Sequence, residues 1–440
     1  MIKLIVGLST KIFKSNHFIL LLGNALVAAL GFLSFIYLAR MLSKEIFGAW
    51  VIYLTAFNFM EMLRAGAIHQ ALVRNLAAAT SPEEQQAIVG ASWRLGILIS
   101  LVLSVILLGL ASLERIWAYS SGWQLFLRWY PLTAWISLPL SMTLWIQHAR
   151  ERFRWMASIN LSVNLLFLAA LLLISHQVLS LSLLFLLHAA SRLLVSGGLL
   201  VSDWAEGSSI FKTNWQALRK QWAFGRFSFL TLIGTNLLQS ADILLISIFL
   251  GEKAAATYAL PLKLIEVVAL PLRSMAMVAF PRFSRLYSAQ QRVPLLRSFK
   301  SYSMGYTLVL LPFLALAGVF SETIIRYLGG EAYTDGIWVL NIFLVFILFL
   351  PLDRFSGILL DSIHAPQINS VKVLVMAGIN IVGDAIVLYF FQNLWAVALI
   401  TILNVLFGLV IALFYIVKKL DLPNWRYLLS PGLHSSLEAG

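Results

Sequence analysis

The sequence predicts an all-α integral membrane protein with about 12 transmembrane helices. Of its 440 residues, 60% are hydrophobic and only 12% are charged, whereas soluble domains contain about 25% charged residues. Apolar segments of about 20 residues recur along the whole chain, which is the length that a helix needs to cross a bilayer. Short segments of alternating polarity, which are typical of transmembrane barrels, do not stand out.

The first apolar segment follows a basic stretch, residues 1–17, which contains Lys3, Lys11 and Lys14. The apolar run continues from residue 18 to 39. It is longer than the core of a signal peptide, and no small-residue cleavage site ends it. We therefore expect an uncleaved first transmembrane helix.

The remaining apolar segments predict eleven further helices. In the first half of the chain, the helices are expected at about 18–39, 48–72, 93–113, 126–147, 157–175 and 178–200. In the second half, they are expected at about 224–250, 254–280, 301–320, 335–358, 368–390 and 394–417.

The longest polar connection, residues 201–222, divides the chain near its middle. Its bulky apolar residues recur at helical spacing, as in an amphipathic helix lying in the membrane interface: Phe211, Trp215, Leu218 and Trp222. We expect an N-terminal six-helix bundle over residues 1–200, a cytoplasmic linker over 201–222 and a C-terminal six-helix bundle over 223–440.

A weak internal repeat supports two related bundles. A shift of 208 residues places LSKE (42–45) on LGEK (250–253), Trp50 on Tyr258 and Arg74 on Arg282. Transporters are often built from such repeats.

Basic residues gather in the connections of one side, so the positive-inside rule predicts that both termini are cytoplasmic. The net charge of +13 is explained by basic loops lying against anionic lipid headgroups, rather than by nucleic-acid binding. The chain contains no cysteine, which excludes disulfides and thiolate metal sites.

Charged residues inside the eighth segment form one stripe: Lys263, Glu266 and Arg273 are three and seven residues apart. Charges within a membrane are costly and usually face a partner or a watery cavity. The stripe predicts a cavity-lining helix that offers positive charge to an anionic substrate. Alternatively, Lys263 and Glu266 pair with each other, and Arg273 extends to the lipid headgroups.

Four further charges lie inside other apolar segments. Glu61 and Arg64 stand three residues apart on the second segment, where they form a local ion pair or line the same cavity. Asp242 on the seventh segment has the character of a proton or cation site, or of a carboxylate paired permanently with a base. Asp384 lies near Asn380 and has no evident partner in the sequence.

Sequence signatures of catalysis do not occur. We find no Walker A loop, no H-E-x-x-H and no G-x-S-x-G motif, and no carboxylate-rich loop that would hold a divalent metal. We therefore expect a protein that is not an enzyme and has no metal centre.

Several motifs together resemble a known family. LARMLSKEIFGAWVIYLTAF (38–57), RAGAIHQALVRN (64–75) and the pattern FGR…D…LLISIFLGEKAAATYALPLKL (224–264) are similar to the polysaccharide-transporter branch of the multidrug/oligosaccharidyl-lipid/polysaccharide (MOP) exporter superfamily. That branch is typified by Wzx-type O-antigen flippases.

The resemblance implies two pseudo-symmetric six-helix bundles in a V shape around a central cavity, as in multidrug (MATE) exporters of the superfamily. It implies a flippase that moves undecaprenyl-diphosphate-linked oligosaccharide from the cytoplasmic to the periplasmic leaflet of the bacterial inner membrane by alternating access. The implied diphosphate ligands are Arg64, Lys263 and Arg273. Asp242, Glu61 and Glu266 would balance charge or bind the coupling ion, H⁺ or Na⁺. A polysaccharide polymerase and a chain-length regulator are the implied protein partners.

Three alternatives stay open. A multidrug/cation antiporter needs a cavity dominated by carboxylates, whereas here cationic groups are at least as numerous. Lipid II flippases typically have two additional helices. A membrane polymerase or acyltransferase needs larger extracytoplasmic loops than these connections provide.

Overall fold

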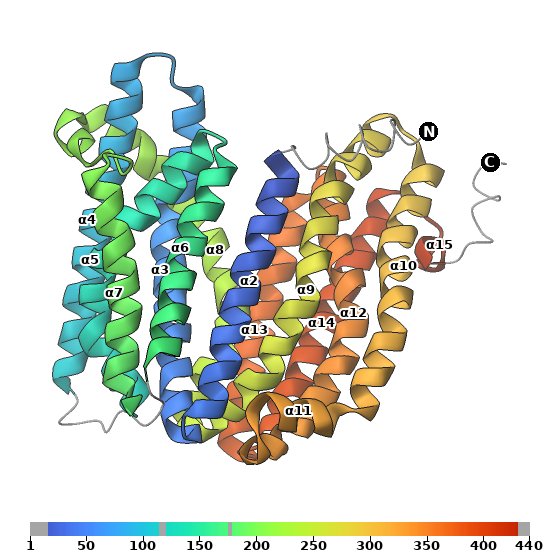
Figure 1. Cartoon of the computed structure of the whole chain (residues 1–440). Coiled ribbons are helices and arrows are strands. Elements are labelled where there is room, and N and C mark those ends of the chain that lie inside the picture. The colour runs from blue at the N-terminus through green and yellow to red at the C-terminus, as the bar shows by residue number, and fades with distance from the viewer. Residues whose placement is uncertain (1–15, 114–119, 175–177, 430–440) are drawn as a thin grey trace, which may run out of the picture. The chain divides into compact units, whose positions relative to one another are not determined.

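The computed structural model describes residues 16–113, 120–174 and 178–429, and every regular element in these ranges is helical (Figure 1). The basic residues predicted to precede the first helix lie outside the described residues. The all-α fold class is confirmed. Ten described helices are long and apolar enough to cross a membrane.

The chain divides into two compact units, Met1–Asn236 and Leu237–Gly440. The long helices of the first unit are α2 (Asn16–Met41), α3 (Lys44–Ala78), α4 (Pro82–Ser112), α5 (Ser121–Ala149), α6 (Phe153–Leu173) and α7 (Leu181–Val201). Helix α8 (Trp215–Phe249) begins in the first unit and ends in the second. The second unit continues with α9 (Gly251–Ser288), α10 (Arg292–Val319), α11 (Ser321–Gly329), α12 (Ile337–Ser362), α13 (Pro366–Phe390), α14 (Leu394–Lys419) and α15 (Arg426–Leu429).

Each of the twelve predicted segments falls on one long helix, and most helices extend several residues beyond the apolar run. At the starts of α3 and α4, a serine side chain caps the extended helix. The Ser43 hydroxyl accepts a hydrogen bond from the Ile46 amide at 3.4 Å, and the Ser81 hydroxyl accepts one from the Glu84 amide at 3.2 Å. Such side-chain caps satisfy amides that the first helical turn leaves free.

Helix α9 is continuous through Pro261, Pro271 and Pro281. Each proline removes one backbone donor, and neighbouring helices in a membrane protein stabilise the freed carbonyls. Helix α9 begins at Gly251, directly after α8. The φ of Gly251 is 79°, a left-handed conformation that favours glycine.

The segment predicted as a separate amphipathic helix is divided differently in the structure. A 3₁₀ turn, η3 (Gly207–Lys212), is followed by Trp215, which begins α8. Helix α4 packs closely against η3. The Trp93 indole donates a hydrogen bond to the carbonyl of Ala205 at 2.8 Å, and the Thr213 hydroxyl donates one to the carbonyl of Ala87 at 2.8 Å. The stretch after α7 therefore covers one end of the first unit.

The two units have the same pattern of neighbouring helices. In the first unit, α5 contacts α3, α4 and α7, and α6 contacts α7. In the second unit, α12 contacts α9, α10 and α14, and α13 contacts α14. The α5–α6 turn therefore corresponds to the α12–α13 turn, and the end of α7 corresponds to the end of α14.

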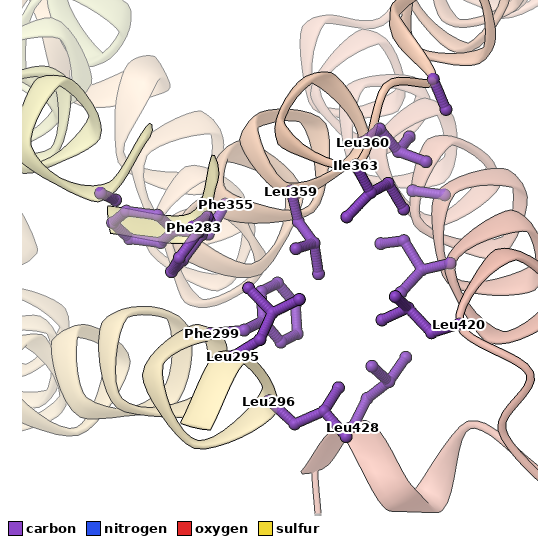
Figure 2. Close-up of a cluster of buried hydrophobic side chains, with 14 of the residues drawn as sticks. Phe283, Leu295, Leu296, Phe299, Phe355, Leu359, Leu360, Ile363, Leu420 and Leu428 are labelled. Atoms are coloured by element: carbon purple, nitrogen blue, oxygen red, sulfur yellow. The ribbon is translucent and has the colours of Figure 1, made fainter. Parts of the chain in front are cut away.

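A large apolar cluster of the second unit lies at the end that carries the α9–α10 turn. Figure 2 shows Phe283 beside Phe355, with Phe299 and with leucines of α10, α12, α15 and the residue after α14 completing the cluster. Close packing of this kind fixes the positions of the α9–α10 turn, the α12–α13 turn and the end of α14.

Candidate functional site

A cluster of buried polar side chains lies inside the second unit, with Asp242 of α8 at its centre. The Asp242 carboxylate accepts hydrogen bonds from the Tyr258 hydroxyl at 2.5 Å, the Asn380 amide at 2.6 Å and the Thr401 hydroxyl at 3.2 Å. Four helices, α8, α9, α13 and α14, supply these groups. Asp242 is only 7% exposed.

A second carboxylate, Asp384, completes the cluster. The Asn380 side-chain nitrogen donates to Asp384 at 2.7 Å as well as to Asp242, so a single amide joins the two acids. Asn404 in turn donates to the side-chain oxygen of Asn380. Asp384, Asn380 and Asn404 are each at most 1% exposed.

The cluster has more acceptor oxygens than donors. Among the described residues, no basic side chain pairs with Asp242 or Asp384. One oxygen of Asp384 and the side-chain oxygen of Asn404 have no hydrogen-bond partner. Two adjacent buried carboxylates repel each other when both are ionised. This arrangement can therefore take up a proton or a hard cation, which oxygen ligands favour.

The first unit holds an ion pair between Glu61 and Arg64 of α3. Arg64 is fully buried. Its guanidinium donates to Ser100 of α4 at 3.2 Å and, on α5, to the Ala134 carbonyl at 2.7 Å and to Ser141 at 3.2 Å. The structure thus shows the local pair that the spacing allowed. The partners of Arg64 enclose its guanidinium within the first unit.

Beside this pair lies a second, half-buried base, Arg192 of α7. Its Nε donates to the His188 ring at 3.0 Å, and its guanidinium lies 4.7 Å from the centre of the Phe57 ring. Because Arg192 can only donate, the accepting nitrogen of His188 carries no proton, and the other ring nitrogen donates to the Tyr53 hydroxyl at 3.3 Å. Glu61 thus has two arginines near it: Arg64, with which it pairs, and Arg192, whose charge attracts it.

The charges of α9 are more accessible than those of the two buried clusters. Lys263 pairs with Glu266 at 2.6 Å, and their side chains are 30% and 50% exposed. Arg273 is exposed and forms no ion pair with any described residue. It lies near Arg354 of α12, close enough for their charges to repel each other.

The structure therefore groups the predicted residues in three places. Glu61 and Arg64 share a buried pair, Lys263 and Glu266 share an accessible one, and Asp242 lies in a separate cluster. The partners of Asp242 could not be predicted from the sequence, because they lie between 16 residues (Tyr258) and 159 residues (Thr401) away along the chain. A sequence signal was present only in the i, i+4 spacing of Asn380 and Asp384.

Two helical units with the same neighbour pattern, each with charges buried among long apolar helices, are an arrangement that occurs in secondary transporters. A family model described as "Polysaccharide biosynthesis protein" matches residues 13–287, more than half of the chain. The chain belongs to this polysaccharide biosynthesis family. A search of curated proteins found no match.

Solved structures of MOP-superfamily transporters have the same fold. An inward-closed lipid II flippase MurJ matches with 14% identity and a TM-score of 0.69, covering 91% of this chain and 88% of that one. An inward-facing MATE transporter matches with 14% identity and a TM-score of 0.70, covering 94% and 96%. A MOP transporter from Pyrococcus furiosus matches with 11% identity and a TM-score of 0.62, covering 92% and 96%.

Proposed function

We propose that the protein is a flippase for undecaprenyl-diphosphate-linked oligosaccharide, the repeat unit of O-antigen or another surface polysaccharide. The polysaccharide biosynthesis family and the transporter fold support this assignment. In this proposal the chain lies in the bacterial inner membrane with both termini in the cytoplasm. It delivers its substrate to a polysaccharide polymerase and a chain-length regulator.

The observation that carries the transport mechanism is the pair of buried carboxylates. Asp242 and Asp384 have no basic partner among the described residues, and two nearby oxygens are free. In the proposed cycle this cluster takes up H⁺ or Na⁺ as an antiporter does, and the gradient of that ion drives transport. Release of the ion restores the repulsion between the carboxylates, which destabilises the conformation that had bound it.

The proposed substrate ligands are the accessible bases of α9. Arg273 has no carboxylate partner among the described residues and presents a planar fork that suits phosphate oxygens. Lys263 adds a second positive charge, and Glu266 balances part of it. Because Arg64 is enclosed by its own partners in this conformation, we propose that it holds Glu61 rather than contacting the diphosphate here.

The coupling site is tested with purified protein in proteoliposomes that contain a fluorescent undecaprenyl-diphosphate sugar and an imposed Na⁺ or H⁺ gradient. Asp242→Asn and Asp384→Asn should reduce gradient-driven translocation to background, because each removes one of the two negative charges. Asp361→Asn is the matched control. Asp361 accepts hydrogen bonds from Asn369 at 3.0 Å in the same unit but outside the cluster, and this variant should translocate normally.

Gradient-dependent translocation that persists in both cluster variants would refute the coupling role. Wild-type protein that moves cationic dyes but no lipid-linked sugar would instead identify a multidrug antiporter.

The substrate site is tested by measuring binding of the same lipid-linked sugar to Arg273→Ala. Loss of one charge-assisted contact should weaken binding by roughly tenfold or more. Arg285→Ala removes an exposed base from the last turn of the same helix and should bind normally. Equal binding by the two variants would remove Arg273 from the site.

A further inference from the structure

A cavity of about 620 Å³ lies at one end of the second unit, where three helix ends meet. The α9–α10 turn, the α12–α13 turn and the end of α14 form its walls. Its lining includes Tyr287, Arg292, Leu295, His364, Lys419 and Leu420. Cavities of about 300–1,000 Å³ are typical of small-ligand sites.

The cavity is basic. Arg292 and Lys419 are both exposed, and neither forms an ion pair or a side-chain hydrogen bond with a residue that the structure describes. The His364 ring packs edge-on against Tyr287, with 5.6 Å between the ring centres. None of the lining residues is an acid. Two positive charges thus face a space in which no described carboxylate balances them.

The walls are held in place by backbone geometry. Gln290, His364 and Asp421 end their helices in the left-handed region, with φ of 55°, 59° and 51°. At each end, the next amide bonds back to a carbonyl five residues earlier, as from Gln291 to Leu286 at 3.0 Å. This capping motif closes a helix tightly. The cavity is therefore preformed.

The floor of the cavity is apolar. Leu295 and Leu420 are 0% and 2% exposed and belong to the cluster that Figure 2 shows. The cavity therefore offers positive charge and polar groups at its walls, and the buried leucines beneath it hold those walls in place.

The first unit also has bases near its α5–α6 turn and near the end of α7, and these bases have partners within the protein. There Arg150 of the α5–α6 turn pairs with Glu206, and Arg94 of α4 donates to the Ile210 carbonyl at 3.1 Å. The chain that follows α7 supplies both partners. Arg150 and Arg94 of the first unit thus have protein partners, whereas Arg292 and Lys419 of the second unit form no ion pair with a described residue.

We propose that this cavity binds the phosphate-bearing headgroup of an anionic phospholipid. It lies at the ends of three helices that are long and apolar enough to cross a membrane, and the ends of such helices are the parts that meet lipid headgroups. Basic pockets at the ends of transmembrane helices bind such headgroups.

The test uses the full-length protein in nanodiscs of phosphatidylcholine that contain a low fraction of phosphatidylglycerol. Native mass spectrometry after release from the nanodiscs counts the phosphatidylglycerol molecules that stay bound. Arg292→Gln combined with Lys419→Gln should weaken phosphatidylglycerol binding by about 25-fold, because each base near the membrane surface contributes a factor of about five. Binding of phosphatidylcholine should not change.

The matched control removes the same charge at the same end of the unit. Arg297 and Lys418 are exposed and do not line the cavity, so Arg297→Gln with Lys418→Gln should retain phosphatidylglycerol. Equal loss in both double variants would overturn the proposal, because the effect would then be diffuse surface charge. Inorganic pyrophosphate that binds wild-type protein equally well in neutral nanodiscs and displaces the lipid would overturn it in favour of a soluble phosphate ligand.

Discussion

At the scale of single residues, the buried charges of the two units are stabilised in different ways. Arg64 has a carboxylate and three further acceptors, so its charge is compensated within the protein. Asp242 has three donors but no opposite charge, and a second carboxylate shares its amide partner. The first arrangement is suited to stability and the second to reversible binding of a cation.

Arg64→Ala should destabilise the protein by about 3–5 kcal/mol, because it leaves the half-enclosed Glu61 without its partner. The midpoint of thermal unfolding in detergent measures this loss. The paired replacement of Glu61→Gln with Arg64→Gln should recover a large part of the stability. A single variant as stable as wild type would show that the pair is not structural. If the double variant folds but no longer binds lipid-linked sugar, Arg64 itself contacts the substrate.

At the scale of elements, the contact between α4 and the segment after α7 depends on one glycine. A β-carbon at Gly90 would lie 2.0 Å from the carbonyl oxygen of Ser209, and a backbone atom cannot move aside cheaply. Gly109, on the same helix, has open space around the corresponding position.

Gly90→Ala should therefore lower the free energy of unfolding by about 1–3 kcal/mol, the usual effect of overpacking. Gly109→Ala should leave it unchanged or raise it by about 0.5–1 kcal/mol, because alanine favours a helix interior. Thermal unfolding of the two purified variants, side by side with wild type, measures both effects. Equal midpoints for the two variants would contradict the packing argument.

At the scale of the whole molecule, the distribution of basic residues predicts the orientation in the membrane. The α9–α10 turn lies in a basic region, whereas α11 and the turn after it lie at the opposite end of the second unit (Figure 1). The positive-inside rule predicts that the α9–α10 turn is cytoplasmic.

The chain contains no cysteine. A maleimide therefore labels only a cysteine that is introduced by mutation, and its labelling shows on which side of the membrane that position lies. Ala332→Cys should react with a membrane-impermeant maleimide in intact cells, whereas Ala289→Cys should react only after the membrane is permeabilised. Both positions are exposed. The reverse pattern of labelling would invert the orientation.

The sequence alone determined the fold class, the number of long helices and their approximate positions. The reason is that membrane insertion is encoded locally, by the length and polarity of each apolar run. It also located Asp242 and the Glu61–Arg64 pair, because a charge inside an apolar segment is conspicuous and an i, i+3 pair lies on one helix face.

Only the tertiary structure decided which helices bring their polar groups together. In a membrane helix most faces are apolar, so periodicity gives little information about which face meets which neighbour. Asn380 reaches Asp242 across 138 residues of chain, and Thr401 reaches it across 159. Helix packing sets those contacts, and with them it turns two isolated carboxylates into one cluster.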